Sequence, residues 1–225
     1  MTSTEILTVT LLTARVSLVA TAAILLPGVA VGFFLARARF RLLKPFLRTL
    51  VSLPMVLPPV AVGLLLLEAL SLEAALGRAI EALAGGPVLL TWRAAAIAAA
   101  VMSFPLLVLG AEQGFASVPR RLEDVATTLG ATRRRVFFRV TLPIASRGIL
   151  YGLVFAFARG LGEFGATALV AGHIPGETET LSLAIYGRIR EFRDADAAVF
   201  CAVSLLLAFA TTFLAERFLK RERRP

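Results

Sequence analysis

Two ionisable side chains interrupt one of the apolar segments of this chain. Arg159 and Glu163 lie in the segment from Gly148 to Gly172, four residues apart and therefore on one face of a helix. A charge at the centre of a membrane helix costs about 2.5 to 3.5 kcal/mol on insertion scales, so such a residue usually serves a transport path or a switch. We expect the two to pair, either beside a path or as a structural pair that only fixes the helices.

Glycines surround this pair and a proline cluster occupies an earlier apolar segment. The glycines allow close backbone approach or a break that exposes N–H groups. The prolines at 54, 58 and 59 predict a bend that faces protein, as a path lining or as a simple kink. The candidate residues for a path or gate are Arg159, Gly162, Glu163, Gly165, Thr167 and Pro58.

A second pattern occupies the basic segment from 117 to 143. Ser117 is a candidate helix cap, Pro119 suits a first turn, and Gly130 can end the helix. An apolar stripe at i, i+3, i+4 and i+7 is formed by Leu122, Val125, Ala126 and Leu129. The pattern predicts a short amphipathic helix, either docked into a groove or lying at the membrane surface, and a further helical stretch over 132–141.

Catalytic patterns are absent from the sequence. There is no G-x-x-x-x-G-K-[ST], so the chain itself should not hydrolyse ATP, and no H-E-x-x-H or G-x-S-x-G. An intramembrane enzyme acting on lipid would rest only on Glu163 and the basic cytoplasmic surface. His173 is expected to be an ordinary loop residue without a metal site, and Glu177 and Glu179 to be solvated loop charges or contacts for an external partner. Cys201 is expected to be a small apolar residue of the last span.

The positions of these residues depend on a membrane. The chain is 58% hydrophobic, with a mean hydropathy of +0.82. Its net charge of +9 comes from short runs between apolar segments, which argues against a nucleic-acid partner. A helix needs about 20 apolar residues to cross a bilayer. Five segments qualify, at 16–35, 49–67, 94–111, 148–172 and 197–215, and predict an all-α polytopic protein.

Basic residues gather in alternate loops and predict the orientation. Cytoplasmic loops retain Lys and Arg, which places the N-terminus outside and the C-terminus inside. The predicted cytoplasmic clusters are Arg37, Arg39, Arg41, Lys44 and Arg48, then seven arginines from Arg120 to Arg147, then Arg217, Lys220, Arg221, Arg223 and Arg224. We expect one domain over 1–225, with a core of about 9–215. A short amphipathic helix is expected between Glu68 and Arg93, and Trp92 as an interfacial anchor.

The basic segment resembles the permease subunits of ATP-binding-cassette importers. Their signature is E-A-A, three residues, G, nine residues, I, one residue, L-P. Here Asp124-Val125-Ala126, Gly130, Val140 and Leu142-Pro143 keep that spacing, with conservative replacements. The resemblance implies a coupling helix seated in a separate cytoplasmic ATPase. The coupling residues would be Glu123, Asp124, Ala126, Leu129, Gly130, Leu142 and Pro143, within a coupling loop of about 117–143.

Two further stretches are similar to the permeases of molybdate importers. They are 158–167 and the run Ile174-Pro175-Gly176-Glu177-Thr178. The resemblance implies a homodimer in the cytoplasmic (inner) membrane and two ATPase subunits that hold ATP and Mg. It also implies a periplasmic or extracellular binding protein that delivers molybdate or tungstate. Sulfate and thiosulfate permeases are the near alternative. A membrane scaffold that transports nothing is the remaining one.

Overall fold

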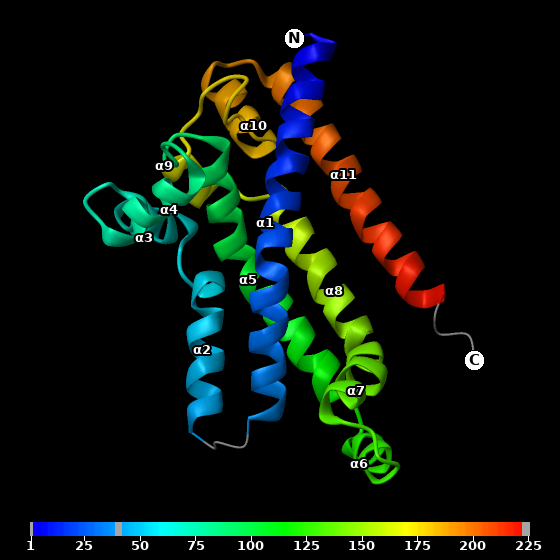
Figure 1. Cartoon of the computed structure of the whole chain (residues 1–225). Helices are drawn as coiled ribbons and strands as arrows, with labels where there is room; N and C mark the ends of the chain where they lie inside the picture. Colours follow the sequence, from blue (N-terminus) through cyan, green and yellow to red (C-terminus); the bar gives the residue numbers. More distant parts are fainter. Residues whose placement is uncertain (1, 39–41, 222–225) are drawn as a thin grey trace.

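The computed structural model describes residues 2–38 and 42–221. Arg39, Arg41, Arg223 and Arg224, and the side chains of Lys220 and Arg221, lie outside the described part, so these members of the basic clusters are not placed. Every regular element in the described ranges is a helix (Figure 1). They are α1 (Ser3–Arg37), α2 (Leu43–Val56), α3 (Pro59–Leu70), α4 (Ala75–Ala84), α5 (Trp92–Ala116), α6 (Arg120–Thr128), α7 (Arg133–Val136), the π-helix η1 (Phe137–Thr141), α8 (Leu142–Leu161), α9 (Gly165–Val170), α10 (Leu181–Arg190) and α11 (Asp194–Arg221).

The centre of the bundle is α5, which packs against both α1 and α8. α5 is apolar on all sides and is the most buried of the spanning helices, as expected for a helix surrounded by others. Small residues bring the backbones together, because apolar side chains gain nothing by leaving lipid for another helix. A Cβ on Gly148 of α8 would lie 2.4 Å from the Cα of Gly114 on α5. A Cβ on Gly110 would lie 2.5 Å from the Cα of Gly152.

Four helices are long and apolar enough to cross a membrane, and the pair α2 and α3 makes a fifth span if it is counted together. The expectation of about five spans is therefore confirmed. The second predicted span, 49–67, is not straight, because α2 and α3 meet at an angle of 105°. The proline cluster accounts for this: Pro58 caps α3 and Pro59 begins it, where a missing N–H costs no helical bond.

The fourth span has other limits than the sequence predicts. The predicted segment 148–172 is correct only in its first part, because α8 ends at Leu161 and α9 is a separate short helix. The structure also extends this span toward the amino terminus, through η1 and α7, to Arg133. Gly162 ends α8, and Glu163 and Phe164 are not helical. A charged residue flanked by glycines thus breaks the span.

The two ends of the bundle differ. The N-terminus lies at one end and α6 at the other, and α11 runs back toward the α6 end (Figure 1). α4 confirms the short helix expected between Glu68 and Arg93, and Trp92 is the first residue of α5.

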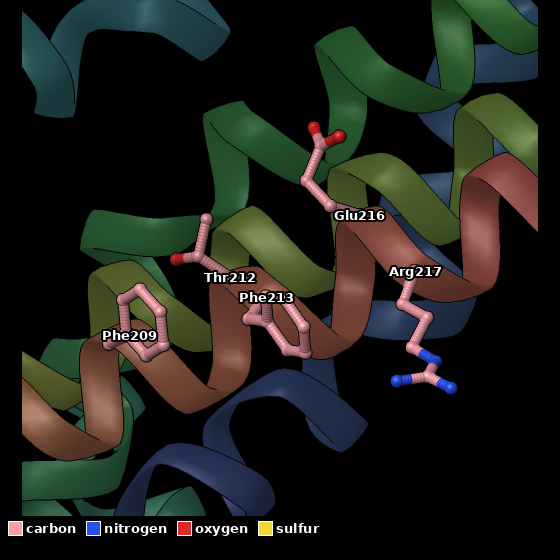
Figure 2. Close-up of a pocket in the computed structure, with 5 residues that line it drawn as sticks. All are labelled: Phe209, Thr212, Phe213, Glu216 and Arg217. Carbon is pink, nitrogen blue, oxygen red and sulfur yellow. The ribbon is translucent and has the colours of Figure 1, made fainter.

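Late in α11, a pocket of about 600 Å³ is lined by Phe209, Thr212, Phe213, Glu216 and Arg217 (Figure 2).

The close contact between α5 and α8 yields a test of the fold. Gly148→Ala should lower the thermal unfolding midpoint in detergent, because its Cβ forces two backbones apart at a cost of about 1–3 kcal/mol. Gly160→Ala on the same helix is the control. Its Cβ would meet nothing nearer than Ser17 at 3.4 Å, and alanine favours the helix by about 1 kcal/mol. Equal midpoints for the two variants would contradict this account of the packing.

Candidate functional site

The breaks in the two interrupted spans lie against each other. α3 packs on α9, and their backbones nearly touch. A Cβ on Gly165 would lie 2.8 Å from the Cβ of Pro59, and a Cβ on Gly63 would lie 2.8 Å from the Cα of Ala166. We call this region the paired breaks: residues 57–60, where α2 passes into α3, and residues 162–165, where α8 passes into α9. It brings Pro58, Gly162, Glu163 and Gly165 of the predicted path set into one neighbourhood.

Glu163 occupies the second break and is bonded on both sides of it. Its side chain is only 2% exposed. Oε1 accepts a hydrogen bond of 3.0 Å from the N–H of Ala166, which satisfies a free donor in the first turn of α9. Oε2 lies 2.8 Å from Nη1 of Arg159 in an ion pair without hydrogen-bond geometry. The Arg159 side chain is 32% exposed, so it has further donors to offer.

The pairing predicted for Arg159 and Glu163 is thus confirmed, but the predicted reason is wrong. They do not share a helix face, because α8 ends between them. Gly165 is required by its contact with Pro59, whereas a Cβ on Gly162 would meet nothing within 4 Å. Thr167 is buried within α9. The structure therefore supports a joint between two helices at this place rather than one continuous charged face.

The predicted coupling helix is present as α6, at the opposite end of α8. Gly130 adopts a positive φ of 82°. The N–H of Gly130 donates to the carbonyl of Thr127, and the N–H of Ala131 donates to that of Ala126. These two bonds form a Schellman motif, which confirms Gly130 as the end of the helix. The cap expected at Ser117 is wrong, since its hydroxyl donates to the carbonyl of Gly114 at the end of α5.

The apolar stripe of α6 has no cover in this chain. Leu122 and Val125 are exposed, and Leu129 is 83% exposed, while Ala126 is half-buried. The carboxylate of Asp124 makes no ion pair with any described residue. An exposed apolar stripe of this size on a charged loop is typical of a helix that docks into a partner groove.

The side chain of Glu123 contacts other helices of this chain. Its Oε1 accepts from Nη2 of Arg37, at the end of α1, at 2.6 Å, and from Oγ1 of Thr141, in η1, at 2.5 Å. The predicted coupling residue therefore anchors α6 to two other helices. Sequence reasoning did not find Arg37 and Thr141 as its partners. Arg37 and Thr141 lie 86 and 18 positions from Glu123 in the sequence, so no local spacing links them to it. The only signal in the sequence is that one side chain is basic and the other carries a hydroxyl.

Behind α6 the chain passes into α8 through a π-helix. Pro143 has no N–H to donate to Arg139, and the N–H of Leu142 instead reaches back five residues to the carbonyl of Phe137. Leu142 and Pro143 thus begin α8. The ring of Phe137 contacts that of Phe33 on α1 (5.3 Å between centroids) and stacks on that of Phe115 on α5 (6.3 Å).

The loop after α9 holds a buried charge cluster that the sequence did not predict. Glu177 is exposed as expected, but Glu179 is buried, so its assignment as a solvated charge is wrong. Its Oε1 lies 3.0 Å from Nε2 of His173 and 3.3 Å from Nη1 of Arg188. Arg188 also pairs with Glu5 of α1. These contacts tie the loop and α10 to the first turns of α1.

Comparisons with known proteins agree on the class of protein. The family model described as "Binding-protein-dependent transport system inner membrane component" matches residues 28–224. The molybdenum transport system permease protein ModB of Escherichia coli K12 is 42% identical over 190 residues, which cover 84% of this chain and 82% of ModB. The sulfate transport system permease protein CysT of the same organism is 36% identical over 86% of this chain and 71% of its own.

A solved structure supports the fold independently. A chain of the inward-facing MetNI methionine ABC transporter matches over the full length of both chains with a TM-score of 0.75. Its sequence identity is 16%, so this likeness bears on the fold alone. It confirms the all-α arrangement of membrane helices.

Proposed function

This chain belongs to the binding-protein-dependent transport system inner membrane components, and from that premise we propose that it carries molybdate across the cytoplasmic (inner) membrane. It is a permease subunit of an ABC importer, a transport channel subunit rather than an enzyme. Molybdate as cargo is supported by the 42% identity with a molybdenum permease, against 36% for the sulfate permease of the same organism. Tungstate has the same shape and charge and belongs to the same cargo class.

The motor of this importer would be a separate ATPase that binds ATP and Mg in the cytoplasm. The single observation that supports this ATPase partner is the exposed apolar stripe on α6, formed by Leu122, Val125 and Leu129. Burial of three such side chains supplies several kcal/mol, since a fully buried leucine contributes about 1.5–3 kcal/mol. We propose that Ala126, Asp124 and Gly130 belong to this contact, and that Glu123, Leu142 and Pro143 act from within the chain.

The path would run beside the paired breaks, between two copies of the chain. Residues 57–60 are exposed in a single copy, and the Arg159 side chain faces partly outward. A second copy would enclose these residues, with Pro58, Gly162, Gly165 and Thr167 shaping the gate. The Arg159 guanidinium is then the cation nearest to an oxyanion in transit. An external binding protein would deliver the anion at the N-terminal end.

Cargo is tested by accumulation in cells that lack or express this chain. At limiting external molybdate, we expect a molybdenum deficit without the chain and recovery with it. At limiting sulfate, we expect sulfur content to be equal in both strains. A sulfur deficit would assign the chain to sulfate and leave the transport mechanism intact. No deficit in either element would favour the non-transporting scaffold.

The end of the coupling helix is tested by Gly130→Pro. Proline requires φ near −65° and removes the N–H bonded to Thr127, so α6 should lose its Schellman end. In proteoliposomes with the ATPase, we expect uptake to fall at least tenfold while ATP hydrolysis continues. Gly85→Pro is a matched control, because Gly85 also ends a helix with a positive φ, but that helix is α4, far from α6 in the bundle. Normal uptake by the Gly130→Pro variant would contradict the coupling role.

The path role of Arg159 can be separated from its structural role. Arg159→Ala leaves Glu163 buried without its cation, which should destabilise the protein by about 3–5 kcal/mol. Combining Arg159→Gln with Glu163→Gln removes both charges and should restore the unfolding midpoint. If Arg159 contacts the anion, this neutral pair folds but its uptake stays at least tenfold low. Full uptake by a stable neutral pair would leave the ion pair with a structural role only.

A further inference from the structure

A second candidate site lies away from the paired breaks. α1, α4 and α5 enclose a pocket of about 210 Å³. Its lining is apolar and includes Val19, Ala23, Ile80, Ala84, Trp92 and Ile97. Trp92 begins α5, and tryptophan is enriched at the boundary between the hydrocarbon core and the headgroups. The pocket therefore opens at the depth where acyl chains meet their headgroups.

Two arginines, Arg15 and Arg93, lie beside this pocket and have no acidic partner among the described residues. The guanidinium carbon of Arg15 lies 3.9 Å from the centroid of the Trp92 ring. Arg93 lines the pocket, and its Nη1 donates to the carbonyl of Ala84 at 2.8 Å. Neither arginine forms an ion pair with any residue of the described ranges, and Glu81 on the adjacent α4 pairs with neither. Arg15 is thus offset only by an aromatic ring and Arg93 only by the last carbonyl of α4, and both guanidinium groups keep further donors for an anion.

We propose that this pocket binds an acidic phospholipid, with one acyl chain in the apolar pocket and the phosphate on Arg15 and Arg93. An acyl chain suits the apolar lining of the pocket. A phosphate accepts hydrogen bonds from the forked donors of a guanidinium group. A zwitterionic lipid would leave the two arginines without net compensation. The inference does not depend on the cargo.

A lipid in the pocket would affect the paired breaks through α4. α4 follows α3 in the chain and contacts it, and α3 packs on α9. The pocket lies where α4 meets α1 and α5, so a lipid that fills it braces α4 against the central helices. An acidic lipid would then stabilise the position of α3, and with it one side of the proposed gate.

Trp92 supplies the test, because it is the only tryptophan of the chain. The full-length protein is placed in phosphatidylcholine vesicles that contain equal fractions of bromine-labelled phosphatidylglycerol or bromine-labelled phosphatidylcholine. Bromine on an acyl chain quenches a tryptophan that it contacts. We expect the acidic lipid to quench Trp92 more strongly, and the preference to fall roughly fivefold for each arginine replaced by glutamine.

Matched variants decide the outcome. Arg190→Gln is the control for charge, because Arg190 also rests on an aromatic ring, that of Tyr186, but does not line the pocket. Ala23→Phe fills the pocket and keeps both arginines, so it should reduce quenching by both lipids, whereas Ala22→Phe should not. Equal quenching by both labelled lipids in the unmodified protein would overturn the proposal. So would a preference that survives the replacement of Arg15 and Arg93.

Discussion

The backbone contact between α5 and α8 is the constraint on which the rest of this structure depends. In lipid, helices gain little from burying apolar side chains, so close packing of small residues must hold them. Gly110 and Gly114 face Gly152 and Gly148, and no side chain fits between them. These two helices also begin and end the coupling loop. Because their separation is fixed, α6 is held between two ends that cannot move apart.

Buried and partly buried carboxylates supply the second kind of constraint. Each joins elements that apolar packing alone would leave free to slide, and each has a cationic partner, without which a buried charge would be strongly destabilising. Glu112 shows the pattern on α2, a helix without a buried residue, which it holds by ion pairs of 3.2 Å and 3.6 Å to Lys44 and Arg48. The other three such pairs are Glu123 with Arg37, Glu163 with Arg159, and Glu179 with Arg188.

The sequence predicts the parts that depend on local rules and misses those that depend on distant contacts. The apolar spans, the bend at Pro58 and the glycine end of α6 follow from composition, proline chemistry and a positive φ, and all three are confirmed. The limit of the fourth span is missed because apolar residues resume after Glu163, so the length of the segment does not show that Gly162 ends α8. The burial of Glu179 is missed because this residue lies in a loop and its partner Arg188 lies near the end of α10, and no local pattern predicts such a pair.

The joint at Glu163 connects the two constraints. Arg159 belongs to α8, which is locked to α5, whereas Glu163 caps α9, which is packed on α3. The ion pair therefore spans the boundary between the locked helices and the pair α3 and α9. Glu123 ties α6 to α1 and η1, so a force on α6 reaches the locked helices first. Under the proposed transport role, relative motion would concentrate where the helical backbone is already broken, at residues 162–164.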